Sequence, residues 1–172
     1  MTGMICPTCG VKGHPIKQLT VDSLAQDTVL QRLKSREGFF YCPTPTCPVA
    51  WFQPETGGMV DKSELKVRIG MKETSDPRPI CYCFDHDAVD FEKEIQEKGQ
   101  SEIPATIAAK CKQGLDRCGE TNPQGSCCLG NVNRVVKAAR QEVEPTPATA
   151  NPFAIVDDQG CCATEERDDA HE

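Results

Sequence analysis

The stretch that decides the fold runs Cys118-Gly-Glu-Thr-Asn-Pro-Gln-Gly-Ser-Cys127-Cys128-Leu-Gly130, and it closes a segment that opens with Cys81-Tyr-Cys83. This segment contains two short helical patterns and is too small to need so many thiols for packing. Cysteines clustered in this way indicate a metal ion or a metal cluster. The sequence therefore predicts a metal-stabilised helical unit, with a second metal site before it and a tail after it.

The composition of the whole chain supports metal stabilisation. The 172 residues are 38% hydrophobic and only 5% aromatic, yet they include 12 cysteines. Small domains that lack apolar surface are usually held together by disulfides or metals. The first residues form neither a charged region nor an apolar region of a signal peptide. We therefore expect a cytoplasmic protein with cysteines as metal ligands, and the alternative is a trimmed, secreted, disulfide-rich protein.

Charge and hydropathy exclude two classes of partner. Residues 1–140 carry 18 basic and 17 acidic side chains, whereas residues 141–172 carry nine acidic side chains and only Arg167 as a base. The body is thus not basic enough to predict nucleic-acid binding. No run of about 18 apolar residues exists, so we expect no membrane insertion.

Four N-terminal cysteines have the spacing of a structural zinc site. The first pair is Cys6-Pro-Thr-Cys9 and the second is Cys42-Pro-Thr-Pro-Thr-Cys47. Aromatic and β-branched residues on both sides of the second pair predict a hairpin with these cysteines at its tip. Four thiolates suit a closed tetrahedral Zn²⁺ site, and a redox dithiol at Cys6 and Cys9 is the alternative. The loop also matches the copper loop of heavy-metal-associated domains, but no strand precedes it and helix-breaking residues follow it.

The rest of this half is predicted as short mixed elements. Apolar periodicity favours a helix over residues 27–34, and alternation favours strands at residues 59–60 and 65–69. His14 follows the first cysteine pair and is interpreted as a surface residue. Residues 72–79 have the composition of a linker, so we place a domain boundary there.

The central unit is predicted to hold three helices. Asp87 is a candidate cap for a helix that ends at Gly99. Pro104 opens a second helix that ends at Gly114, and its periodicity places Cys111 among core positions rather than ligands. A third amphipathic helix is expected from about residue 132 to residue 142.

The remaining thiols of the central unit are the candidate ligands of a cluster. They are Cys81, Cys83, Cys118 and one member of the pair Cys127-Cys128. Four thiolates on turns beside helix ends suit a [2Fe–2S] cluster, in which each iron takes two thiolates. A second zinc ion is the alternative, although a C-x-C spacing is less usual for structural zinc.

At these residues the chain resembles the iron–sulfur and zinc module of CopZ-type copper chaperones, over roughly residues 4–140. The motifs that carry the resemblance are Cys81-Tyr-Cys83-Phe, Ile103-Pro-x-x-Ile107-Ala-Ala and Cys118-Gly-Glu-x-Asn122-Pro-x-Gly125-x-Cys127-Cys128-Leu-Gly130-x-Val132. The second half of that module is similar to bacterioferritin-associated ferredoxin, a small helical [2Fe–2S] fold.

The resemblance implies a role for each cysteine group. It implies cluster ligation by Cys81, Cys83, Cys118 and Cys128, with Cys127 the less favoured fourth ligand. It implies zinc at Cys6, Cys9, Cys42 and Cys47. In the family the cluster is a one-electron donor for copper reduction before transfer to an export ATPase.

The C-terminal region departs from the resembling family. Its full-length members end in a heavy-metal-associated domain, and here residues 141–172 form an acidic, Pro-containing segment that is predicted to be disordered. The vicinal pair Cys161-Cys162 in this tail is either a site for a soft ion such as Cu(I) or Hg(II), or incidental to a solubilising tail.

We therefore predict an α+β protein in three parts: a zinc-knuckle β-hairpin domain over 1–72, a helical [2Fe–2S] domain over 73–140 and the acidic tail over 141–172. The expected function is that of a metallochaperone for soft metal ions, with a heavy-metal P-type ATPase or another metal transporter and a redox protein as partners. The alternatives are a ferredoxin-type electron-transfer protein and an interaction module with two zinc ions. No catalytic constellation is present, and His86 is interpreted as a solvated loop residue, so an enzyme is not expected.

Overall fold

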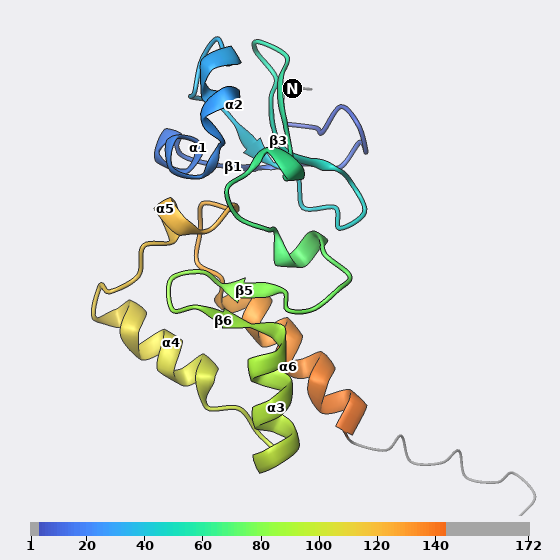
Figure 1. Cartoon of the computed structure of the whole chain (residues 1–172), viewed down its shortest axis with the longest axis vertical. Coiled ribbons are helices and arrows are strands. Elements are labelled where there is room, and N and C mark those ends of the chain that lie inside the picture. The colour runs from blue at the N-terminus through green and yellow to red at the C-terminus, as the bar shows by residue number, and fades with distance from the viewer. Residues whose placement is uncertain (1–3, 144–172) are drawn as a thin grey trace, which may run out of the picture.

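The computed structural model describes residues 4–143 and has a mixed α/β architecture (Figure 1). A four-stranded antiparallel sheet, in the order β1-β2-β3-β4, belongs to the N-terminal half. A two-stranded sheet, β5-β6, and most of the helical residues belong to the C-terminal half. The fold is thus α+β, as expected from the sequence.

The N-terminal half is built around the central strand of its sheet. The strands are β1 (His14–Pro15), β2 (Phe40–Tyr41), β3 (Val49–Gln53) and β4 (Gly58–Asp61). Every residue of β3 is buried, and Trp51 pairs with Tyr41 on one side and with Val60 on the other. The antiparallel pairing of β2 with β3 confirms the predicted hairpin, and the Cys42–Cys47 loop connects the two strands.

Two short helices cover this sheet. They are α1 (Gln18–Leu24) and α2 (Asp27–Arg32), and the second lies within the helix predicted over residues 27–34. Val21, Leu24 and Val29 pack with the buried side chains of the sheet, which gives this half a core of its own.

The strand predicted at residues 65–69 is wrong. After β4 the chain forms a short 3-10 helix, η1 (Lys62–Glu64), in which Asp61 and Glu64 make a capping box. Leu65 then makes only an isolated bridge to Ala25, because no further strand lies beside it. Leu65 and Ile69 are nevertheless buried in the core, which explains the alternating pattern in the sequence.

The C-terminal half consists of a short hairpin and four helices. Its elements are β5 (Pro79–Cys81), β6 (His86–Asp87), α3 (Ala88–Lys98), α4 (Ile103–Lys112), α5 (Cys118–Thr121) and α6 (Leu129–Val143). Asp87 caps α3 by accepting a hydrogen bond from the Asp90 N–H, and Gly99 ends the helix with φ 75°. Pro104 lies in the first turn of α4. These three features confirm the predicted limits of α3 and the predicted start of α4, whereas α6 begins before the predicted residue 132 and α5 was not predicted.

A second hydrophobic core lies among β5, α3, α4 and α6. Phe91, Ile95, Ile107 and Val132 are almost completely buried there. Cys111 is half-buried against the same core, in agreement with its interpretation as a core position.

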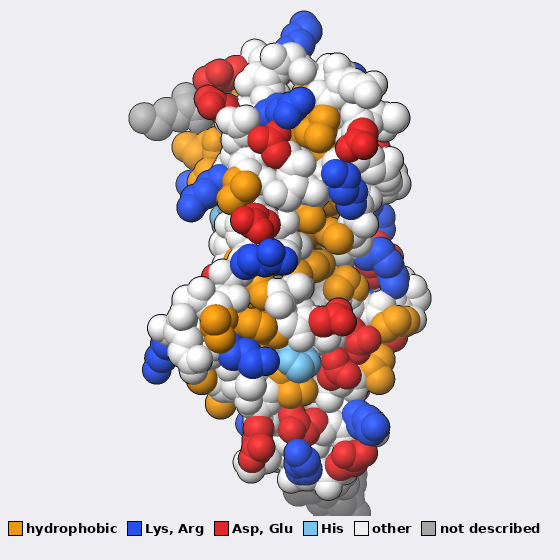
Figure 2. Space-filling view, turned by 60° about the vertical axis from the view of Figure 1, so that its left-hand side comes forward, with side chains coloured by type: hydrophobic (Ala, Val, Ile, Leu, Met, Phe, Trp, Pro, Cys, Tyr) orange, Lys and Arg blue, Asp and Glu red, His pale blue; other side chains and the backbone are white. Residues whose placement is uncertain are grey.

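The two halves are joined by specific hydrogen bonds. The buried Trp51 indole Nε1–H donates to the carbonyl oxygen of Pro123 over 2.8 Å, and the Thr20 hydroxyl donates to that of Gly119 over 2.7 Å. Figure 1 accordingly shows α1 beside α5. In Figure 2, hydrophobic side chains lie where the molecule narrows between its two parts. The domain limits 1–72 and 73–140 stay a prediction, since the two parts share these contacts.

Two further predictions concern membrane insertion and the C-terminal tail. Within residues 4–143, no helix is long and apolar enough to cross a membrane. The predicted disordered tail, including Cys161-Cys162, lies outside the described residues, apart from the last residues of α6.

Candidate metal centres

The four N-terminal cysteines converge on one point. The Sγ atoms of Cys6, Cys9, Cys42 and Cys47 all lie within 4.8 Å of one another. The Sγ atoms of Cys6 and Cys47 are 4.0 Å apart, and those of Cys9 and Cys42 are 3.5 Å apart. Tetrahedral zinc with Zn–S bonds of about 2.3 Å needs sulfurs about 3.8 Å apart. The residues therefore fit a Zn²⁺ ion.

Local backbone structure places these thiols. The Cys6–Cys9 turn is closed by the Gly10 N–H, which donates to the Cys6 carbonyl over 2.9 Å, and Gly10 has φ 72°. This left-handed conformation favours glycine. The Cys42 N–H donates to the Ala50 carbonyl over 2.9 Å, which extends the β2-β3 ladder to the second pair of ligands.

The thiols of this site differ in pKa. Burial acts to raise the pKa of Cys9, but hydrogen bonds with the Thr44 hydroxyl and the Val11 backbone outweigh it and lower this pKa to about 6. Burial raises the pKa of Cys42 to about 12. A metal ion replaces the protons of such a site, so metal binding here depends on pH.

The central cysteines form two separate pairs of thiols. The Sγ atoms of Cys83 and Cys118 are 3.3 Å apart. Cys81 and Cys128 interact through their side chains, and this interaction is the largest influence on both thiols: it lowers the pKa of Cys81 to about 7 and raises that of Cys128. Each pair combines one cysteine of the Cys81–Cys83 loop with one cysteine from the second motif.

Hydrogen-bond donors surround the first of these pairs. The Arg117 N–H donates to the Cys83 Sγ over 3.3 Å, and the Thr121 hydroxyl lies 3.3 Å from the same sulfur. Both residues belong to the turn and short helix α5 that also present Cys118. Such contacts disperse the negative charge of metal-bound sulfur.

The two vicinal cysteines face opposite environments. Cys128 is 2% exposed and belongs to the second core, whereas Cys127 is exposed. Only one of the two neighbouring thiols is therefore covered by the core. The structure turns Cys128 inward, the residue that the resemblance favours.

The two histidines considered from the sequence are not placed as ligands. His14 is exposed in β1, as predicted. His86 was predicted as a solvated loop residue, but it belongs to β6 and is half-buried, with its Nδ1 3.7 Å from a carboxylate oxygen of Asp90. It pairs with Cys81 of β5, and its ring centre lies 6.1 Å from that of Phe91.

Sequence reasoning missed Lys72 as part of the zinc centre. The residue was assigned to a linker, yet its side chain is buried and its Nζ donates to the Thr44 carbonyl in the Cys42–Cys47 loop. The two residues are 28 positions apart, and only the fold brings them together.

The chain is similar to known proteins over most of its length. Residues 3–66 match the family of CopZ-type zinc binding domains. Over 133 residues the chain is 33% identical to the copper chaperone CopZ of Archaeoglobus fulgidus, which covers 77% of this chain. The X-ray structure of the Archaeoglobus fulgidus CopZ N-terminal domain superposes with a TM-score of 0.61 and 29% identity, and the match covers 77% of this chain and 97% of that domain.

The similarity to the copper chaperone extends beyond the zinc-binding domain. A match of 133 residues necessarily continues far beyond residue 66, so the likeness includes the central unit as well as the zinc-binding domain. The chain spans 61% of the length of the curated relative. The family match and the four converging thiols together support bound zinc in the first half.

Proposed function

We propose, from the premise that the described part of this chain is a CopZ-like N-terminal module, that the protein handles soft metal ions and carries a [2Fe–2S] cluster beside its zinc centre. In this proposal Cys81, Cys83, Cys118 and Cys128 hold the cluster. Zinc held by Cys6, Cys9, Cys42 and Cys47 serves a structural purpose, because four protein ligands leave it no open position.

The arrangement of the central thiols is the main structural support for a bound cluster. A [2Fe–2S] centre takes two thiolates on each of two irons. Here the Sγ atoms of Cys83 and Cys118 are 3.3 Å apart, and Cys81 and Cys128 are buried in the same core cluster. A single tetrahedral ion would instead gather all four. Among residues 4–143, the N-terminal cysteines are the only group of three or more His, Cys, Asp or Glu residues whose ligand atoms are all mutually close. This difference favours a cluster over a second zinc ion.

The metal that we propose as cargo is copper. The curated relative is named a copper chaperone, and thiolates select soft ions such as Cu(I). A [2Fe–2S] group supplies single-electron transfer, which is what the conversion of Cu(II) to Cu(I) requires. The partners would be a heavy-metal P-type ATPase or another metal transporter, and a redox protein that returns the electron. Such a role is metal handling rather than catalytic turnover.

The first experiment is metal and sulfide analysis of the full chain purified without oxygen. We expect about two irons, two acid-labile sulfides and one zinc per chain, with a visible spectrum that dithionite bleaches. Two zinc ions and no sulfide in cells able to build clusters would contradict the proposal and favour the two-zinc interaction module.

A second experiment separates metal handling from plain electron transfer. Stoichiometric Cu(II) is added to the dithionite-reduced, desalted protein, and Cu(I) is measured with bicinchoninate. We expect about one Cu(I) per cluster together with return of the oxidised spectrum, and retention of Cu(I) by the protein when the chelator is omitted. Reoxidation without retention of Cu(I) would favour the ferredoxin-type alternative.

A further inference from the structure

One charged side chain lies inside the protein beside the zinc centre. Lys72 ends the 3-10 helix η2 (Gly70–Lys72) and is only 5% exposed. Its Nζ donates hydrogen bonds to the carbonyl oxygens of Thr44, over 2.6 Å, and Cys47, over 3.2 Å. Both carbonyls belong to the loop that carries two zinc ligands.

When ionised, the four zinc-site thiols place negative charge around this ammonium group. All four zinc-site cysteines interact electrostatically with Lys72, and their charge opposes the lowering of its pKa by burial. The Nζ also lies 5.7 Å from the centre of the Tyr41 ring, directly before Cys42 in the chain. Among the residues that the structure describes, no carboxylate forms an ion pair with Lys72, so none neutralises its charge beside the zinc site.

Lys72 supplies one positive charge to the zinc centre. Four thiolates around one Zn²⁺ ion have a formal charge of −2, and a buried charge is costly unless it is paired. One ammonium group reduces this charge to −1. Because zinc binding replaces the remaining thiol protons and leaves an anionic centre at neutral pH, the lysine favours the metal-bound state.

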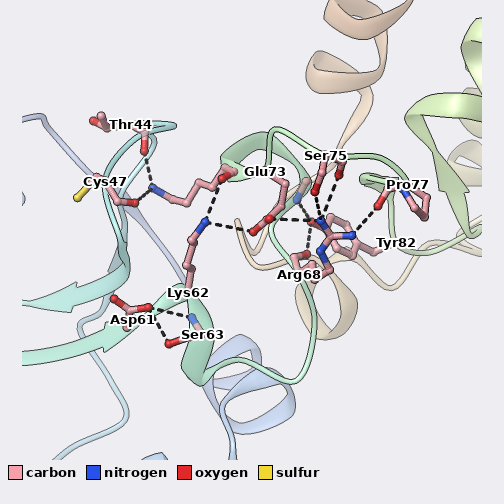
Figure 3. A network of polar contacts seen from close by, with 12 residues as sticks. Thr44, Cys47, Asp61, Lys62, Ser63, Arg68, Glu73, Ser75, Pro77 and Tyr82 are labelled. Atoms are coloured by element: carbon pink, nitrogen blue, oxygen red, sulfur yellow. Dashed lines mark hydrogen bonds and ion pairs between the residues drawn. The ribbon is translucent and has the colours of Figure 1, made fainter.

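A hydrogen-bond network continues from Lys72 to the central cysteines (Figure 3). Lys62 Nζ donates to the Lys72 carbonyl and pairs with Glu73, and Glu73 also pairs with Arg68. The Tyr82 hydroxyl donates to the Arg68 carbonyl over 2.9 Å and accepts a hydrogen bond from the Gly70 N–H over 3.1 Å. Tyr82 lies between Cys81 and Cys83, so η2 contacts both the Cys42–Cys47 loop and the Cys81–Cys83 loop.

We propose that Lys72 is the counter-ion of the zinc tetrathiolate. We also propose that zinc binding, acting through Lys72 and η2, holds the Cys81–Cys83 loop in position. The first part rests only on zinc at the four N-terminal thiols and is independent of copper and of the cluster. The second part assigns the zinc centre a role in preparing the second site, in addition to holding its own half together.

The counter-ion role of Lys72 is tested by comparing the rates at which a neutral and an anionic alkylating reagent react with the zinc-bound thiolates. Zinc release is followed with a chromophoric chelator while the protein reacts with iodoacetamide, which is neutral, or with iodoacetate, which is anionic. We expect Lys72→Met to lower the ratio of the iodoacetate rate to the iodoacetamide rate several-fold, because the site gains a net negative charge. Lys72→Arg should restore the wild-type ratio.

A matched control is Lys66→Met, which removes an exposed lysine from the same segment and should leave the ratio unchanged. If Lys72 only holds the loop in place, Lys72→Met will accelerate the reactions with both reagents equally. An unchanged ratio of the two rates would therefore overturn the counter-ion role. Absence of any zinc signal in the wild type would instead refute zinc binding itself.

The coupling to the second site is tested by hydrogen exchange and mass spectrometry. We expect peptides that cover residues 68–84 to lose protection when zinc is removed from the wild-type protein, and also in Lys72→Met at full zinc occupancy. Unchanged protection of these peptides in zinc-loaded Lys72→Met would overturn the proposed link between the two centres.

Discussion

At the scale of single residues, the vicinal pair Cys127-Cys128 shows how the fold distinguishes two identical side chains. Cys128 is buried beside Cys81, whereas Cys127 faces solvent. A ligand must face the cluster, so the burial of Cys128 makes it the fourth ligand in our proposal. Its neighbour provides a control that differs by one position.

The first prediction concerns this pair. Cys128→Ser should reduce cluster iron and sulfide to less than about a fifth of the wild-type content, because a hydroxyl is a poor ligand for iron. Cys127→Ser should keep most of the content and the visible spectrum. Metal and sulfide analysis measures both, and zinc content in the same samples reports on folding of the first half. The reverse pattern would assign the ligand to Cys127.

At the scale of elements, α3 and α4 are connected by a carboxylate that acts as a cap from outside the helix. Glu94 of α3 accepts hydrogen bonds from the Ser101 hydroxyl over 2.6 Å and from the backbone N–H groups of Glu102 and Ile103. The first N–H groups of a helix have no partner within it, and Glu102 at the N-cap of α4 provides no side-chain cap. Glu94 therefore satisfies the start of α4.

The second prediction concerns the pH dependence of this contact. The hydrogen bond from Ser101, together with those from Lys98 and the two N–H groups, lowers the pKa of Glu94 from 4.5 to about 2. A lowered pKa stabilises the folded state above the ordinary pKa, and this contribution disappears as the pH falls from 4.5 towards 2. Glu94→Gln should thus lose about 1–2 kcal/mol at neutral pH, and progressively less below pH 4.5.

Urea unfolding monitored by far-UV circular dichroism measures this difference at each pH. Glu97→Gln is the matched control, because Glu97 is exposed on the same helix. A difference between wild type and Glu94→Gln that stays constant down to about pH 2 would contradict the ionised cap.

The third prediction concerns the close approach of η2 to β5. A Cβ atom added at Gly70 would lie 1.9 Å from the carbonyl oxygen of Pro79, which no side-chain movement can relieve. Gly70→Ala should destabilise the protein by more than about 2 kcal/mol. Gly130→Ala in α6 is the control: its Cβ meets no atom within 4 Å, and alanine favours a helix, so stability should stay equal or rise. Thermal unfolding compares the two, and equal stabilities would refute the tight packing.

At the scale of the whole molecule, the turn that follows α5 lies against the zinc-binding half. Trp51 and Thr20 of that half donate to the carbonyls of Pro123 and Gly119, which lie within the motif from Cys118 to Gly130. Gly125 fits there because a side chain would meet Ile16 and Thr20, and its φ of 65° is unfavourable for other residues. The surface of the first half therefore supports the turn between Cys118 and Cys128.

The fourth prediction concerns this interface. Thr20→Val keeps the shape of a fully buried side chain but leaves the Gly119 carbonyl without its donor, at a cost of about 1–2 kcal/mol. Because α5 carries Cys118, we expect several-fold faster loss of the visible absorbance in the presence of a chelator, with zinc content unchanged. Thr28→Val, at an exposed position of α2, should leave the rate unaltered. Equal rates for both variants would show that the interface does not support the second site.

The sequence by itself determined the features that depend on neighbouring residues. The limits of α3 follow from Asp87 and Gly99, because caps act within one turn. Likewise, the thiols of Cys6 and Cys9 share a turn, and the aromatic flanks of Cys42–Cys47 form the strands of one hairpin. The predicted zinc site needed little more than these two local patterns.

Only the tertiary structure decided the features that depend on distant residues. The strand predicted at residues 65–69 did not form, because the chain beside it is the end of α1, which offers Leu65 only an isolated bridge to Ala25. The burial of Cys128 and the exposure of Cys127 follow from which of them the second core covers. Lys72 became a neighbour of the zinc ligands only when the fold brought η2 against a loop 28 positions away. Spacing in the sequence identifies ligands, whereas burial and charge around them arise from packing between segments.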